Sequence, residues 1–299
     1  MTKRIASFSV QFSWLAPRAN VVRQSNARAR LEAVLLSNPV ITLTTDYGTT
    51  DHLVGVLKGI ILRIMPSATL VDISHHVTPY DLLDGALTIG TAYSYFPPRS
   101  IHLVVVDPGV GTQRRPILVS GDQQYFVAPD NGVLSLVYDR EPNILVRHIT
   151  AQHYFLNPVS NTFHGRDIFA PVAAWLAKTY QSEAMGDQIT DYVRFALPKP
   201  KPADAALKGV VMRVDSFGNL LTNFSAEDLP AEMIAAGKIE IEVGAKRIEK
   251  FVATFAQGPA GEPVAFLGSS GFVEIAVNKG SAARTLGANR GAEVTLKLA

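Results

Sequence analysis

Val40-Ile41-Thr42-Leu43-Thr44-Thr45 is the stretch that decides the fold, because this short β-branched run ends in the turn-forming residues Asp46-Tyr47-Gly48. Such a run is typical of a buried strand. Apolar residues at helical spacing follow it, and Pro66 ends the series: Leu53, Val56, Leu57, Ile60, Ile61 and Ile64. This spacing predicts an amphipathic helix, so the chain opens with the strand–helix unit of an α/β domain.

The alternation of strand and helix continues beyond Pro66. Strands are predicted at 69–73 and 101–106, with a helix between them from about Asp81 to Phe96 that Pro97-Pro98 ends. Strands joined through helices pair in parallel. Further strands are predicted near 117–120, 124–127 and 144–149, and a helix begins near Asp167. We therefore expect an α/β N-terminal domain over 39–196, with a central, mostly parallel sheet flanked by helices.

A second, all-β domain is predicted after a proline-rich linker. The linker, 197–208, opens with Leu-Pro-Lys-Pro-Lys-Pro, which cannot continue a helix or a central strand. Short strands separated by turn residues follow at 210–214, 239–243, 248–255, 263–267, 272–277 and 294–298. The pattern predicts an antiparallel β barrel or sandwich over 209–299.

Residues 1–38 differ from the rest of the chain. They are rich in arginine, and Glu32 is their single acidic residue. No apolar run is long enough for a secretory signal, so the segment is interpreted as a flexible extension or a transit peptide, and both alternatives stay open.

Composition narrows the possible functions. A chain of 299 residues with 47% hydrophobic and 18% charged residues is typical of a two-domain globular protein. A net charge of +2 gives no field suited to nucleic acid, so a small-molecule partner is expected. The absence of cysteine excludes disulfides and thiolate chemistry and suits the cytoplasm. No apolar run reaches the roughly 18 residues of a membrane span.

Acidic residues stand at or near the ends of three predicted strands of the first domain. Asp46, Asp72 and Asp107 stand at or near strand ends, where the ligand crevice of an open parallel sheet forms. A carboxylate in such a place binds ribose hydroxyls or holds a proton, whereas a structural Asp caps a turn. Three acids together favour function, with Asp46 and Asp107 best placed.

Two further segments carry reactive side chains. The glycine-rich run 107–115 includes Arg114, but it is neither a Walker loop nor a dinucleotide fingerprint. His164 directly precedes the predicted helix at Asp167. No metal is expected, because His75 and His76 are adjacent and no His-Glu-x-x-His motif is present. The polar turns of the second domain are, by themselves, ordinary β turns.

Seven motifs in order resemble the S-adenosyl-L-methionine hydroxide adenosyltransferase family, which is related to fluorinases and chlorinases. They run from about Val40 to the C-terminus and read T-T-D-Y-G, V-D-I-S-H, V-D-P-G-V-G-T-x-R-R, P-D-N-G-V-L, T-F-H-G-R-D-I-F, D-x-F-G-N-x-x-T-N and E-I-A-V-N-x-G-S-A-A. Each motif is weak separately, but their shared order makes a chance match implausible.

The resemblance implies an activity, an assembly and a set of site residues. The activity is hydrolysis of S-adenosyl-L-methionine to adenosine and methionine without a cofactor, in a homotrimer whose sites lie between subunits. Asp107, Arg114 and His164 match the residues associated with water activation. The positions that match ligand contacts are Asp46 for the ribose, Tyr80 and Phe96 around the sugar and sulfonium, Asp215 and Ser269 for the methionine, and Phe217, Asn219 and Asn278 for adenine.

Two other functions remain as alternatives. A halogenase uses halide at the same carbon, but the chain runs from Phe96 to the strand at Ile101 without the extra fluorinase loop, and Gly165 stands where fluorinases carry a halide-contacting serine. A non-catalytic S-adenosyl-L-methionine or adenosine binder is the second alternative, although such a protein would not need Asp107, Arg114 and His164.

Overall fold

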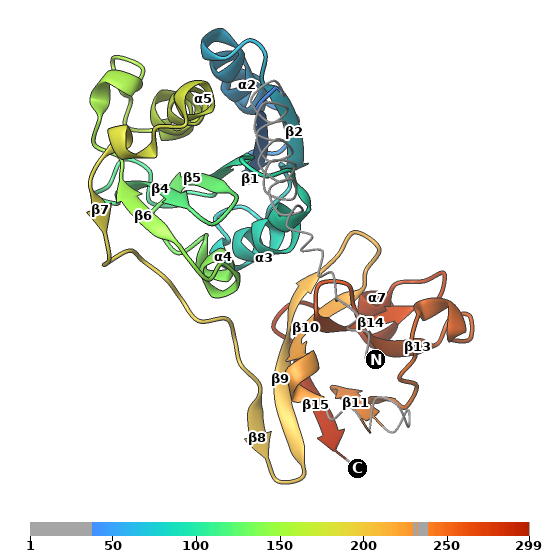
Figure 1. Cartoon of the computed structure of the whole chain (residues 1–299). Coiled ribbons are helices and arrows are strands. Elements are labelled where there is room, and N and C mark those ends of the chain that lie inside the picture. Colours follow the sequence, from blue (N-terminus) through green and yellow to red (C-terminus); the bar gives the residue numbers. More distant parts are fainter. Residues whose placement is uncertain (1–37, 230–231, 233–238, 299) are drawn as a thin grey trace, which may run out of the picture. The chain divides into compact units, whose positions relative to one another are not determined.

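The computed structural model describes residues 38–229, 232 and 239–298 (Figure 1). The basic extension predicted at the N-terminus lies, apart from Asn38, outside these residues. Within the described part of the chain, no helix is long and apolar enough to cross a lipid bilayer.

The first domain is built on a mixed sheet of seven strands. In sequence order they are β1 (Val40–Thr45), β2 (Thr69–Ser74), β3 (Ile101–Val105), β4 (Pro116–Ser120), β5 (Tyr125–Pro129), β6 (Leu145–His148) and β7 (Gln188–Ile189). Their spatial order is β2-β1-β3-β5-β4-β6-β7. The first four in this order pair in parallel, and the remaining pairs are antiparallel. The short turn between β4 and β5 permits only a hairpin, which is why half of the sheet is antiparallel.

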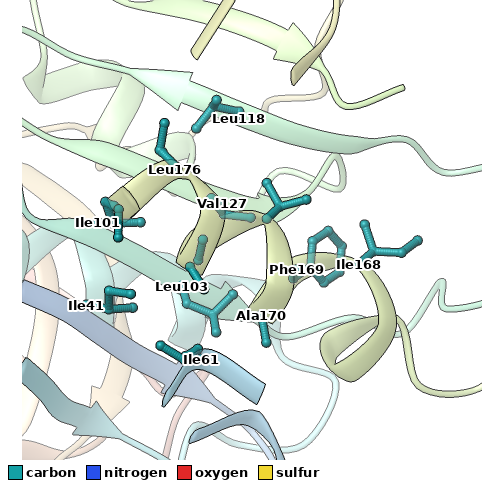
Figure 2. Close-up of a cluster of buried hydrophobic side chains, with 14 of the residues drawn as sticks. Ile41, Ile61, Ile101, Leu103, Leu118, Val127, Ile168, Phe169, Ala170 and Leu176 are labelled. Carbon is teal, nitrogen blue, oxygen red and sulfur yellow. The ribbon is translucent and has the colours of Figure 1, made fainter. Parts of the chain in front are cut away.

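Helices cover both faces of this sheet, as predicted. They are α2 (Leu53–Ile64), α3 (Leu82–Ala92), α4 (Ser135–Arg140) and α5 (Ala170–Thr179). Side chains of β3 alternate between the two faces: Leu103 is buried with α2 and α5, whereas Val104 is buried with α3 and α4. Figure 2 shows the first of these clusters, in which Leu103 lies near Ile61 and Ala170. Strands buried on both sides require the continuous apolar runs seen in the sequence.

The second domain is an antiparallel sheet that nearly closes into a barrel. Its strands are β8 (Lys201–Ala203), β9 (Ala206–Val214), β10 (Leu220–Ser225), β11 (Ile239–Val243), β12 (Lys246–Ile248), β13 (Pro263–Leu267), β14 (Phe272–Val277) and β15 (Glu293–Leu298). The order is β12-β11-β15-β9-β10-β14-β13, with β8 beside β9. A bridge between Phe251 and Ala265 joins the segment after β12 to β13, and so brings the two ends of the sheet together.

The strand predictions for this domain need two corrections. The sequence pattern does not predict strand β10, because its first residues belong to the motif D-x-F-G-N-x-x-T-N, which is interpreted as a turn. The strand predicted at 248–255 is wrong, since pairing with β11 ends at Ile248 and the chain turns toward β13. The boundaries 39–196, 197–208 and 209–299 stay predictions, and β8 lies inside the segment predicted as the linker.

Candidate active site

Two carboxylates meet at the carboxyl edge of the parallel strands. Strands β1 and β3 pair in register, with Thr45 opposite Val105. Asp46 follows β1 directly and Asp107 follows β3 by two residues, so both leave the sheet at the same edge. They line one cavity of about 330 Å³. The structure therefore brings together two acids that are 61 positions apart in the sequence.

Asp46 is held by the backbone of Tyr80. The Tyr80 N–H donates a hydrogen bond to Asp46 Oδ2 at 3.0 Å, and Tyr80 has a left-handed backbone with φ of 66°. Burial raises the pKa of Asp46, and the negative charge of Asp107 adds to this rise. The Tyr80 ring lines the same cavity and is 74% exposed. Asp46 and Tyr80 thus form a polar part and an aromatic part of the cavity wall.

Asp107 and Arg114 form a buried ion pair. Arg114 Nε donates to both carboxylate oxygens at 2.9 and 3.0 Å, and Nη2 makes a further short contact with Oδ2. The two side chains are only 6% and 8% exposed, and the guanidinium lies 5.0 Å from the Phe169 ring centroid. Such a forked pair fixes the geometry of both groups. Arg114 Nη1 is buried without a hydrogen-bond partner among the described residues, which leaves a free donor.

His164 reaches this pair because of a close backbone approach. Gly111 has φ of +78°, and a Cβ atom there would lie 2.4 Å from the carbonyl oxygen of Asn161. Only glycine lets the 107–114 loop pack this closely against the segment that carries His164. Arg114 Nη2 then lies 2.8 Å from His164 Nδ1.

The contact with Arg114 determines which ring nitrogen of His164 carries the proton. A guanidinium only donates, so Nδ1 accepts and the neutral imidazole carries its proton on Nε2. Burial lowers the pKa of His164, and the positive charge of Arg114 lowers it further. Asp107, Arg114 and His164 therefore form one hydrogen-bonded chain with a neutral imidazole at its end.

Tyr47 and Phe163 belong to this site but were not singled out from the sequence. The Tyr47 ring lines the cavity beside Gly165 and meets Phe163 edge-on, with ring centroids 5.9 Å apart. Both residues lie inside the quoted motifs T-T-D-Y-G and T-F-H-G-R-D. Their position next to Asp46 and His164 was the signal that could have identified them.

Three predicted site residues of the second domain line a separate cavity. Asp215, Phe217 and Asn219 share a space of about 560 Å³ that has no lining residue in common with the first cavity. The Asp215 carboxylate accepts hydrogen bonds from the Phe217 N–H and from both nitrogens of Asn219, so it also holds the β9–β10 turn. Phe217 is 78% exposed.

Three predicted contacts lie elsewhere. Asn278, between lining residues of the second cavity, donates its amide to the Gly258 carbonyl at 3.1 Å. Ser269 is exposed in the turn between β13 and β14. Phe96 packs against His102 with ring centroids 5.6 Å apart, near the amino end of β3. Within the single chain, Phe96 thus lies at the sheet edge opposite Asp107.

Across residues 38–229, 232 and 239–298, the structure contains no group of three or more His, Asp or Glu side chains arranged to hold a metal ion.

Comparison with known proteins matches both domains. Residues 41–186 match the SAM hydroxide adenosyltransferase N-terminal domain, and residues 209–295 match the C-terminal domain. An (R)-S-adenosyl-L-methionine hydrolase from Thermus thermophilus is 34% identical over 272 residues, which cover 86% of this chain and 99% of the relative. A fluorinase from an Actinoplanes species is 29% identical over 291 residues, which cover 87% and 97%.

A solved structure has the same architecture. The crystal structure of an uncharacterized conserved protein from Thermotoga maritima is 39% identical, with a TM-score of 0.80, and the match covers 86% of this chain and 100% of that one. The sequence and structural similarities therefore extend over the same two domains.

Proposed function

This chain belongs to the S-adenosyl-L-methionine hydroxide adenosyltransferase family, and we propose that it hydrolyses S-adenosyl-L-methionine to adenosine and methionine. The observation that carries the residue assignment is the hydrogen-bonded chain Asp107–Arg114–His164 beside a cavity that Asp46 also lines. In this assignment the three residues bind the attacking water, and Asp46 binds the ribose hydroxyls.

The reaction needs little from the protein beyond alignment of the water. The water oxygen attacks the ribose C5′ carbon, the C5′–S bond breaks, and its electron pair stays on sulfur. Methionine leaves as a neutral thioether, so the leaving group requires neither a proton nor a metal. Holding the water in line with the breaking bond supplies up to about 7–11 kcal/mol in ideal cases.

The attacking water gives up one proton, and the contacts favour Asp107 as its acceptor. His164 Nδ1 is occupied by Arg114, and Nε2 already carries a proton, so the imidazole serves as a donor that orients the water. The positive charge of the Arg114 guanidinium, which is paired with Asp107 at the edge of the cavity, stabilises a hydroxide-like oxygen. Asp107 is the one anion of the three, so it can accept a proton that Arg114 and the occupied His164 imidazole cannot take.

Two features favour water over halide as the nucleophile. Gly165 offers no hydroxyl of its own to a halide, which must lose its hydration shell before it attacks, and the single Tyr47 hydroxyl beside it does not replace that shell. The chain also passes from the short helix η1 (Tyr93–Tyr95) to β3 through residues 96–100 alone, which leaves no space for an added loop. Halogenation is the alternative reaction at the same carbon, and the experiment below distinguishes it from hydrolysis.

The assembly that we propose is a cytoplasmic homotrimer with sites between subunits. The support is that the ligand residues of the two domains line separate cavities within one chain. Tyr80 and Phe217, both assigned to the ligand, are largely exposed in the single chain. A neighbouring subunit would cover these rings and bring the Asp215 cavity to that of Asp46. Sedimentation of the purified protein tests this assembly.

The test of the reaction is incubation with S-adenosyl-L-methionine in ¹⁸O-water containing chloride. Hydrolysis predicts adenosine with the label in its 5′-hydroxyl group. Formation of 5′-chloroadenosine would favour the halogenase instead. Binding without any product over hours would identify a non-catalytic binder and overturn the proposal.

A further inference from the structure

The hydroxyl of Tyr47 occupies the space beside Gly165. A Cβ atom added at Gly165 would lie 2.5 Å from Tyr47 Oη, closer than real Cβ atoms approach an oxygen. The next nearest atoms, on Leu57 and Phe163, are both 3.5 Å away, which is ordinary van der Waals contact. Of the three atoms nearest to such a Cβ, the hydroxyl oxygen alone is too close for an alanine methyl group at position 165.

The phenol is held in this position by its neighbours. Tyr47 follows Asp46 in the turn after β1, and its backbone N–H donates to Thr45 Oγ1 at 3.3 Å. Its ring meets Phe163 edge-on, at an interplanar angle of 69°. A residue fixed at both its backbone and its ring has a defined position for its terminal oxygen.

The surroundings keep this hydroxyl protonated. Burial raises the pKa of Tyr47, and the negative charges of Asp46 and Asp107 raise it further, while Arg114 opposes them. Tyr47 is therefore a neutral O–H donor in the cavity that Asp107 lines. Gly165, which it touches, directly follows His164.

We propose that Tyr47 is a further catalytic residue, whose hydroxyl hydrogen-bonds the attacking water, and that Gly165 is a glycine because this hydroxyl needs its space. The inference rests on the proposed hydrolysis. Bond making and breaking at C5′ are unchanged, and the phenol keeps its own proton throughout. Its role is to help fix the line of attack, together with Asp107, Arg114 and His164.

The pair makes a specific prediction of non-additivity. Tyr47→Phe removes the hydroxyl, so kcat should fall about 10²–10³-fold, as for loss of one preorganised donor, while KM changes less than about 3-fold. Gly165→Ala should lower kcat comparably, because its methyl group displaces the hydroxyl. In the Tyr47→Phe background the same methyl group fits, so Gly165→Ala should change kcat less than about 2-fold.

The experiment compares these three variants with wild type and with Tyr125→Phe. Tyr125 is a partly buried tyrosine at the start of β5, at the opposite sheet edge, and its variant should keep the wild-type kcat. Thermal unfolding of every variant checks the fold, and a Gly165→Ala protein that folds only with Tyr47→Phe would support the steric part directly.

Three outcomes distinguish the possibilities. A Tyr47→Phe enzyme with wild-type kcat would overturn the inference while leaving hydrolysis intact. Multiplying effects in the double variant would show that the residues act independently, and would overturn it also. A wild-type protein that releases no adenosine would instead refute the proposed function on which the inference rests.

Discussion

The ion pair between Asp107 and Arg114 allows a test that distinguishes the effect of a substitution on kcat from its effect on the free energy of unfolding. In Asp107→Asn the side chain keeps its size, but Arg114 loses its counter-charge in a site where both groups are less than a tenth exposed. Breaking a buried pair costs about 3–5 kcal/mol of unfolding free energy, and the remaining amide hydrogen bond recovers part of this. Loss of a positioned acid–base group should lower kcat about 10²–10⁴-fold.

A second pair in the same domain provides the matched control. Arg115 donates from Nε and Nη2 to Asp130 Oδ2 at 2.9 and 2.7 Å, and the Asp130 side chain is 2% exposed. Asp130→Asn therefore makes the same chemical change outside the cavity. We expect it to lower stability by a similar or smaller amount, because Arg115 is 26% exposed, and to leave kcat of the folded enzyme unchanged.

The assays are urea unfolding and single-turnover release of adenosine from S-adenosyl-L-methionine. Calorimetric titration with adenosine should give nearly the same affinity for wild type and Asp107→Asn, because the carboxylate acts on water rather than on the nucleoside. If Asp107→Asn and Asp130→Asn both retained the wild-type kcat, Asp107 would have only a structural role. Equal losses in both would show that the activity depends on stability alone.

Two other perturbations test the remaining groups. The pKa of His164 in the folded protein lies below its ordinary value of 6.5, so the neutral ring and its contribution to stability are present above pH 6.5 and are lost as pH falls through the lower folded pKa. A plot of kcat/KM against pH should therefore fall on the acid side as His164 becomes protonated. The same fall at the same pH in His164→Gln would assign it to another group. Asp46→Asn should raise KM about 10–100-fold through the loss of charged hydrogen bonds to the ribose, with a smaller effect on kcat; an unchanged KM would argue against ribose binding by Asp46.

Local sequence was sufficient for much of the first domain. The apolar stripe from Leu53 to Ile64 predicted α2, and Pro66 marked its end, because helix periodicity and the missing proline N–H act over a few residues. The ordered motifs identify the family, and the same motifs contain Asp107, Arg114 and His164. The structure adds the contacts between these three side chains.

Strand pairing and close contacts depended on the tertiary structure. The direction of β4 follows from its hairpin with β5, and the missed strand β10 exists because β9 and β14 lie on either side of it. Neither partner is visible in a local pattern, since residues that pair in a sheet are distant in the chain.

For the candidate active site too, some features follow from local sequence and others depend on the tertiary structure. The sequence by itself determined which side chains are present at the edge of β1 and β3, because an acid that follows a parallel strand emerges there. Only the folded chain decided that Phe96 lies at the other edge, that Arg114 bonds Nδ1 of His164, and that the Tyr47 hydroxyl fills the space at Gly165. The last two are contacts between segments 50 and 118 positions apart in the sequence, and the first is the direction of a side chain. Packing of the whole domain determines all three.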